Sequence, residues 1–312
     1  MTSSGFGASN NRNSSNYRSH DTSGTSQRPI APFTMILKSR IKQPQFYWFL
    51  GHFFTLYHFL KFHLSFFSIA SQKYHYRMIL LNISITYGIV LYQFLKSGQL
   101  KLTWSNIREN VRTLDNLQYF IMLSTLFICS ILSGGKVSIT GASYAPVIFS
   151  IFHCLNYFKE NLLPFLPISP QLKSVLNRRI TLFLANYNEK FLTMAQTFEI
   201  MCALRVGLFG LPMTLLKIIF NFHWNNLLSL IVIANYVIFF KLRLLQSESM
   251  KLLLNQVILR VDNYLLASPN MMQFQPFWLR YKQLVARLYD LVPPSLNTIA
   301  KTQSTPKKSN HI

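Results

Sequence analysis

The chain has 312 residues, of which 50% are hydrophobic and only 13% are charged, whereas a soluble domain typically carries about 25% charged residues. It contains 31 Lys and Arg against 9 Asp and Glu, which gives a formal net charge of +22. This composition excludes an ordinary soluble domain. Because the basic residues flank apolar runs rather than forming one block, they indicate phospholipid headgroups, not nucleic acid, as the anionic partner.

The predicted fold class is all-α, with polytopic membrane helical hairpins followed by cytosolic or interfacial amphipathic helices. Residues 1–40 are rich in Ser and Asn and carry several Arg residues, so they are predicted to be a disordered basic tail. Residues 41–245 are predicted to form the membrane domain of paired hairpins. Residues 246–293 are predicted to lie at the membrane surface, and residues 294–312 to form a second disordered basic tail.

The first two predicted spans are residues 46–70 and residues 77–95. Residues 71–76 separate them, and the sequence predicts a tight hairpin with its turn at Lys73, Tyr74, His75 and Tyr76.

Residues 117–158 are predicted to form a central hairpin, with two apolar runs on either side of a turn that contains Gly134, Gly135 and Gly141. A spanning helix needs about twenty apolar residues, so runs of about sixteen are marginal alone but make sense as a pair that dips into or just crosses a bilayer.

Ser169 followed by Pro170 is typical of a helix start, and residues 170–188 are predicted to form a basic amphipathic helix. A span at residues 191–211 follows and is predicted to stop at Pro212. The last predicted span is residues 226–240, which is followed by Lys241 and Arg243.

The distribution of basic residues predicts the topology. The connections at 96–115 and 159–190 hold four and five Lys or Arg, whereas the turns at 73–77, 133–142 and 212–225 hold two, one and one. Basic connections stay on the cytosolic side of a membrane, so this alternation predicts an even number of crossings with both termini cytosolic.

The chain after residue 246 changes character, because apolar residues now recur on one face of each of two helices, with basic residues between them. This pattern is typical of helices that lie in the headgroup plane, although a small cytosolic hairpin that packs these faces together also fits it. The predicted membrane-surface apolar face comprises Met250, Leu254, Val257, Ile258, Val261, Leu265, Phe277, Trp278, Tyr281, Leu284, Val285 and Leu288. The basic residues predicted to contact headgroups are Lys251, Arg260, Arg280, Lys282 and Arg287.

No constellation for catalysis is evident. The chain has no His-x-x-x-His pair, which argues against a membrane desaturase, and no paired carboxylates, phosphate-binding glycine loop or serine elbow. We therefore expect no enzyme activity, no metal and no cofactor. Glu199 and Arg205 are ionisable residues inside an apolar run, where such residues are costly. They are six residues apart and so lie on different helix faces, which favours contact between helices; a polar transport path is the alternative.

Two segments resemble the transmembrane protein 33 family, whose fungal members include pore-membrane nucleoporins and a tetra-spanning membrane protein of the endoplasmic reticulum. They are LKSVLNRRITLFLANYNEKFLTMAQTFEIM at 172–201 and YVIFFKLRLLQSESMKLLLNQVILRVDNYLLAS at 236–268. The resemblance runs from about residue 36 to residue 288, and Glu199 falls where the family shows Glu-Ile in the same setting.

This resemblance implies residence in the endoplasmic reticulum and the nuclear envelope, with association with curvature-inducing reticulon-type proteins. It also implies a part in nuclear pore assembly or distribution, nucleoporins as partners, and a nuclear import receptor that binds the basic C-terminal region. The function hypothesis is therefore a non-enzymatic protein that shapes or stabilises curved membrane, and the alternative is a transporter or channel that uses Glu199 and Arg205.

Overall fold

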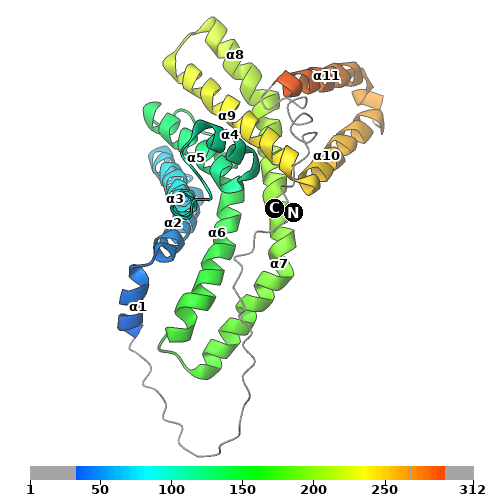
Figure 1. The fold of residues 1–312 in the computed structure, drawn as a ribbon. Coiled ribbons are helices and arrows are strands. Elements are labelled where there is room, and N and C mark those ends of the chain that lie inside the picture. The colour runs from blue at the N-terminus through cyan, green and yellow to red at the C-terminus, as the bar shows by residue number, and fades with distance from the viewer. Residues whose placement is uncertain (1–32, 268, 292–312) are drawn as a thin grey trace, which may run out of the picture.

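The computed structural model describes residues 33–267 and 269–291, and every regular element within these ranges is a helix (Figure 1). The prediction of an all-α fold is thereby confirmed. The first helix, α1 (Phe33–Ile41), begins inside the segment that the sequence assigned to the N-terminal tail. The rest of that tail and the predicted tail at 294–312 lie outside the described residues.

Helices α2 (Pro44–Leu64) and α3 (Ile69–Lys96) form the first hairpin. The prediction of a turn at residues 73–76 was wrong, because the chain reverses at Ser65 to Ser68. The Ser65 amide donates to the Lys61 carbonyl at 2.9 Å, and the Ser68 hydroxyl accepts from the Ser71 amide at 3.3 Å. A side chain that caps the first turn fixes where a helix begins. The Ser68 cap therefore starts α3 before residues 73–76, the polar residues at which the sequence predicted the turn.

The next elements are α4 (Trp104–Thr113), α5 (Asp115–Leu132), a 3-10 turn η1 (Thr140–Ser143) and α6 (Tyr144–Tyr157). The turn after α5 uses Gly134 and Gly135, whose φ angles of 64° and 79° only glycine adopts readily. The 14 residues of α6 are too few for a regular spanning helix. A π turn, η2 (Phe158–Leu162), and a 3-10 turn, η3 (Leu163–Phe165), end this part of the chain.

The predicted amphipathic helix and the span that follows it are one continuous helical stretch. It comprises α7 (Pro170–Arg205), the π turn η4 (Val206–Gly210) and α8 (Leu211–Phe220), 51 residues in all. The prediction that Pro212 stops the helix was wrong. The π turn shifts the hydrogen bonds, and the Leu211 amide bonds to the Val206 carbonyl. Pro212 then sits at the start of the next helical segment, where its missing amide hydrogen is not needed.

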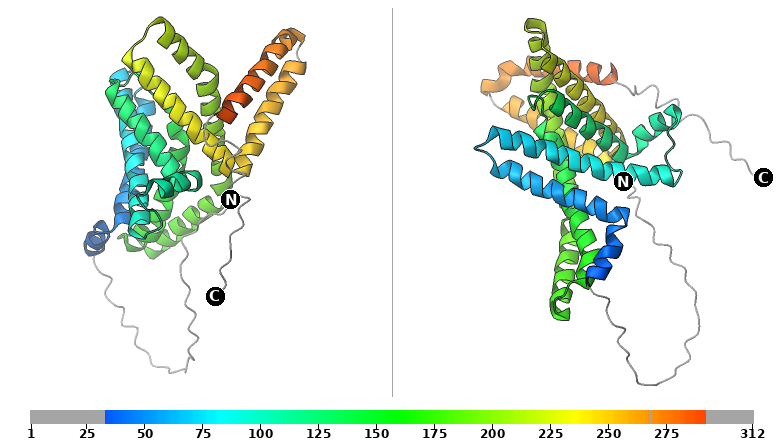
Figure 2. Two further views of the ribbon diagram at one scale, coloured as in Figure 1. Left: turned by 45° about the horizontal axis from the view of Figure 1, so that its top comes forward. Right: turned by 90° about the vertical axis from the view of Figure 1, so that its left-hand side faces the viewer.

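The remaining elements are α9 (Trp224–Gln246), α10 (Glu248–Ala267), the 3-10 turn η5 (Pro269–Phe274) and α11 (Gln275–Leu291). Figure 2 shows that α6 and α7 run steeply across the direction of α2 and α3. The α10–α11 hairpin and the α8–α9 hairpin diverge from their junction with α7 (Figure 2).

The main core lies where α3, α5 and α9 meet and includes the fully buried side chains of Leu80, Ile83, Leu123 and Val232. Among the helices that the structure describes, four stretches are long and apolar enough to span a membrane: Ile69–Lys96, Asp115–Leu132, Pro170–Phe220 and Trp224–Gln246. This result supports the predicted polytopic membrane fold, with neither α2 nor α6 among the four stretches.

Candidate functional site

Glu199 lies on α7 with only 4% of its side chain exposed, where three helices meet. Its carboxylate accepts a hydrogen bond from the Tyr119 hydroxyl of α5. On its other side, Arg243 of α9 places Nε 3.5 Å from Oε2. The Arg243 Nε and Glu199 Oε2 atoms make no hydrogen bond within the described residues, so this contact is an ion pair.

Arg243 connects this buried carboxylate to the surface. Its guanidinium Nη1 donates to Asp115 Oδ2 at 2.8 Å, and the guanidinium carbon lies 5.4 Å from the centre of the Tyr119 ring. Arg243 is 6% exposed and Asp115 is 55% exposed. The four side chains of Tyr119, Glu199, Arg243 and Asp115 form what we call the polar cluster. It joins α5, α7 and α9 through charges that apolar surroundings make costly to leave unpaired.

Further hydrogen bonds hold α7 to the neighbouring helices. The Tyr236 hydroxyl donates to the Glu199 carbonyl at 3.2 Å. One turn before Glu199, the Gln196 amide nitrogen donates to Ser247 Oγ at 3.3 Å and to Ser249 Oγ at 2.9 Å. These two serines form the junction of α9 and α10, so α7 is tied to the point from which the C-terminal hairpin departs.

The structure does not bring Glu199 and Arg205 together. Glu199 faces the core, whereas Arg205 is exposed on another face of α7. Two surface cavities, of about 460 and 410 Å³, lie elsewhere and are lined by neither residue. The geometry therefore gives no support to a transport path through this pair, and the polar cluster is an arrangement for packing helices.

Sequence reasoning found Glu199 but missed its partners. In the sequence, Arg243 is only a basic residue that follows the last predicted span, and Asp115 ends a predicted connection. A buried carboxylate requires a cation at the same depth among the helices, and this requirement is the signal that could have led to Arg243. Sequence patterns do not reveal the pairing, because Arg243 is 44 positions and Tyr119 is 80 positions away from Glu199.

The described histidines serve as packing and hydrogen-bonding groups. His52 Nδ1 lies 2.8 Å from Ser150 Oγ, and the Nδ1 atoms of His58 and His75 are 2.9 Å apart. In the part of the chain that the structure describes, no three His, Cys, Asp or Glu side chains gather closely enough to hold a metal ion.

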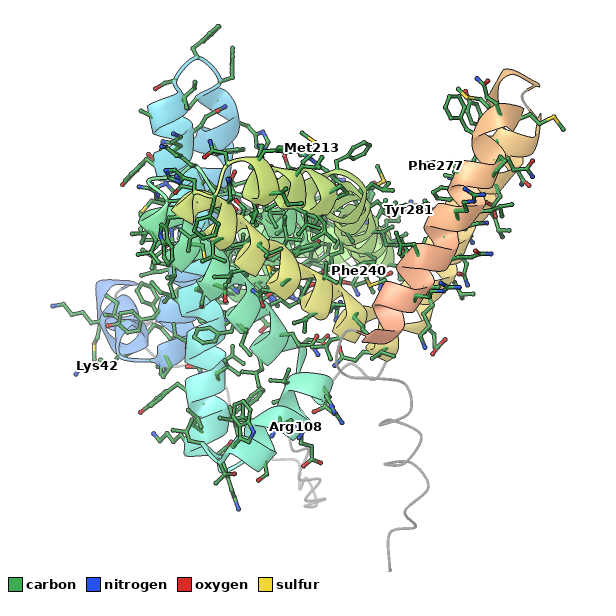
Figure 3. All side chains as sticks on the ribbon, turned by 90° about the horizontal axis from the view of Figure 1, so that it is seen from above. Lys42, Arg108, Met213, Phe240, Phe277 and Tyr281 are labelled. Atoms are coloured by element: carbon green, nitrogen blue, oxygen red, sulfur yellow. The ribbon has the colours of Figure 1, made fainter. Side chains whose placement is uncertain are left out.

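Helices α10 and α11 form a hairpin that a single carboxylate closes. Asp262 accepts hydrogen bonds from the Trp278 indole nitrogen at 2.6 Å and from the Lys282 ammonium at 2.8 Å. Hydrogen bonds from Lys282 and then from Trp278 hold the pKa of Asp262 below its ordinary value. Figure 3 shows this hairpin from above, with Phe277 and Tyr281 along α11.

The apolar face that the sequence predicted for α10 is turned largely toward the protein. Met250 is fully buried and packs with Ile200 and Leu244, while Leu254 and Val257 pack against the same cluster. Ile258 and Leu265 are half-buried, and Val261 lies at the margin of exposure. Leu252, Leu259 and Tyr264, which the sequence did not assign to this face, are 58–63% exposed.

On α11 the predicted apolar face is divided. Phe277, Leu284 and Val285 are exposed, whereas Trp278 and Tyr281 are half-buried and stack on each other with ring centres 5.8 Å apart. Leu288 lies on α11, but its side chain is outside the described set.

The predicted basic residues also differ in their availability. Lys282 is bound to Asp262, and Lys251 is paired with Glu248. Arg260, Arg280 and Arg287 are exposed and make no ion pair within the described residues. These three arginines are therefore the free cations of the hairpin.

The polar cluster makes a direct prediction for Glu199→Gln. The change leaves Arg243 buried with only Asp115 to compensate its charge, so the free energy of unfolding should fall by about 3 kcal/mol, the lower end of the cost of stranding one member of a buried ion pair. Thermal unfolding of the purified chain in detergent measures this loss. Glu189→Gln on the exposed face of the same helix should leave the midpoint unchanged, and equal midpoints for both variants would contradict the role given to Glu199.

The Asp262 contact predicts a pH dependence of the C-terminal hairpin. A carboxyl whose pKa is lowered on folding stabilises the fold above its unfolded pKa, and this stabilisation is lost as the pH falls through the lower folded value. The hairpin should therefore begin to open below about pH 4, and Asp262→Asn should open it at neutral pH. Amide hydrogen exchange along α11 measures the opening, with Glu248→Gln as the control; protection that is identical in both variants would refute the prediction.

Comparison with known proteins gives a consistent result. The sequence profile of the family described as transmembrane protein 33/nucleoporin POM33 matches residues 29–288. The chain is similar to the pore and endoplasmic reticulum protein of 33 kDa from Saccharomyces cerevisiae, with 51% identity over 274 residues that cover 85% of this chain and 97% of that relative. It is also similar to nucleoporin POM33 from Chaetomium thermophilum, with 26% identity over 288 residues that cover 85% and 92% of the two chains.

No solved structure matches the chain. The family profile covers most of the described helices, from before α1 to within α11, and confirms the resemblance noted in the sequence. The chain belongs to the transmembrane protein 33/nucleoporin POM33 family.

Proposed function

We propose that this chain is a non-enzymatic integral membrane protein of the endoplasmic reticulum and nuclear envelope. In this proposal it stabilises curved membrane and supports the assembly or distribution of nuclear pore complexes. The names of its two relatives, one a pore and endoplasmic reticulum protein and the other a nucleoporin, support this location and this association.

The observation that carries the proposal is the C-terminal hairpin beside the membrane-spanning bundle. Its helices expose large apolar side chains, with Phe277 at 72% and Leu252 at 63%, next to the free arginines Arg260, Arg280 and Arg287. Exposed apolar side chains and arginines on paired amphipathic helices favour insertion at the level of the lipid headgroups.

Insertion of this kind has a mechanical effect on the bilayer. A hairpin that enters only one leaflet adds area to that leaflet, and a curved membrane accepts added area on its convex side more easily. The bundle would hold the hairpin at this depth, because the polar cluster and the bonds from Gln196 fix α7, α9 and the start of α10 relative to one another.

The same surface suggests the partners. The three free arginines offer a basic site to a nuclear import receptor, and the spanning helices offer lateral contacts to reticulon-type curvature proteins and to membrane nucleoporins. In the proposed orientation both termini are cytosolic, so the hairpin lies on the side where these partners assemble.

The curvature role is tested with the full chain reconstituted into vesicles of small and large diameter. The double variant Phe277→Glu/Leu284→Glu should lose the enrichment on small vesicles that the unmodified chain shows, because two charged side chains oppose insertion of the hairpin. The control is Leu102→Glu/Leu172→Glu, which changes two exposed apolar residues outside the hairpin. Enrichment that persists in the first variant, or that disappears in both, would count against a role for the hairpin.

The orientation is tested by adding a glycosylation tag to either terminus or within the connection at 96–115 in microsomes. All three positions should remain unglycosylated and open to added protease, whereas a tag between α8 and α9 should be glycosylated, since an odd number of crossings separates each tail from the short turns. Glycosylation of only one terminus would show an odd number of crossings and overturn the orientation.

A further inference from the structure

A surface cavity lies between two of the short turns, away from the C-terminal hairpin. Its volume is about 460 Å³, within the range of small-molecule sites. One wall comes from the turn after α5 and contributes Lys136; the other comes from α8 and the start of α9 and contributes Lys217, Asn221 and Asn225.

The first wall is held by its backbone. The Gly135 amide donates to the Ser130 carbonyl at 2.7 Å, and the Val137 amide donates to the Ser133 hydroxyl at 3.0 Å. Val137 is itself buried. Lys136 therefore stands between two anchored residues, with its own side chain exposed.

The second wall is held by the α8–α9 turn. The side-chain amide nitrogen of Asn226 donates to the backbone carbonyl of Asn221 at 2.9 Å. His223 Nδ1 accepts from the backbone amide of Asn225 at 3.1 Å. Because Nδ1 is an acceptor here, the neutral ring carries its proton on Nε2 and has a further donor available.

The cavity contains several unused donors and is lined by no acidic side chain. The ammonium groups of Lys136 and Lys217 and the side-chain amides of Asn221 and Asn225 make no hydrogen bond or ion pair within the described residues. No Asp or Glu lines the cavity, and the sequence has none between residues 116 and 159 or between residues 200 and 247. Two cations without acids nearby favour an anion, and Lys is a common ligand of phosphate.

The surroundings of the cavity indicate the depth at which it lies. Ile219, Phe220, Phe222 and Trp224 next to it are 55–83% exposed. An exposed tryptophan at the end of a spanning helix, here Trp224, is typical of the boundary between lipid and water, and this boundary is where the phosphates of a bilayer lie. The exposed side chains of Met213 and Leu216 on α8 offer an apolar path for an acyl chain below it.

We infer that this cavity binds the phosphate of an anionic phospholipid, with Lys136 and Lys217 as its two cationic contacts and the asparagine amides as neutral donors. The sequence did not reveal this site because each lysine appeared as a lone charge on a short turn. Only the fold brings residues 136 and 217 to the same cavity.

The test uses the full chain in detergent, titrated with dioleoylphosphatidic acid and separately with dioleoylphosphatidylcholine, with bound lipid counted by native mass spectrometry. The chain should bind the phosphatidic acid more tightly. Lys136→Gln/Lys217→Gln should weaken that binding about thirtyfold, since each lysine near an anionic headgroup contributes roughly 1 kcal/mol and every 1.4 kcal/mol is a factor of ten. Lys136→Arg/Lys217→Arg should retain it.

The matched control is Lys96→Gln/Lys101→Gln, which removes two exposed lysines next to the connection between α3 and α4 and should leave binding unchanged. An equal loss in this control, or no preference for the anionic lipid, would overturn the site. Competition by millimolar inorganic phosphate as effectively as by lipid would assign the cavity to a soluble phosphate and overturn the lipid inference. None of these variants alters the C-terminal hairpin, so the result is independent of the proposed role in curvature.

Discussion

The architecture depends on the ion pair between Glu199 and Arg243. A carboxylate inside an apolar stretch has no water to solvate it, so its position is tolerable only where a cation and hydrogen-bond donors meet it. The Tyr119 hydroxyl donates a hydrogen bond to the carboxylate, and Arg243 supplies the cation. Asp115 accepts a hydrogen bond from Nη1 of the same guanidinium. Four side chains from α5, α7 and α9 thereby define one arrangement of these helices, since sliding any of them along its axis would strand a charge.

A second organising feature is the continuous helical stretch from Pro170 to Phe220. With 51 residues it is far longer than the roughly twenty that cross a bilayer. It contacts α6 along its first half and the main bundle near Glu199, and then continues through the π turn into α8. The cavity near Lys217 lies beside the last turns of this stretch, and the junction with the C-terminal hairpin lies near its middle.

Much of the architecture follows from local sequence. Composition and the spacing of apolar runs predict an all-α membrane protein, and the start of α7 at Pro170 follows from the Ser169 cap.

The sequence was less informative about features that depend on tertiary contacts. The Ser65–Ser68 turn depends on a serine cap that the more polar residues 73–76 obscured. Pro212 is compatible with helix only because the preceding π turn changes the hydrogen-bond pattern. On α10, periodicity alone could not tell which part of the predicted apolar stripe would pack against Ile200 and which would stay exposed. Likewise, the partners of Glu199 come from distant positions that no local pattern connects.

The contacts between Gln196 and the serines at the α9–α10 junction have a mechanical consequence. The hairpin leaves the bundle only one residue after α9 ends, and at that point it is hydrogen-bonded to a helix already fixed by charge pairing. Such an attachment is rigid and holds the hairpin at a fixed angle to the bundle. A change in the tilt of the bundle would swing the hairpin by the same angle, and a torque that the bilayer exerts on the hairpin would be delivered to the centre of the bundle.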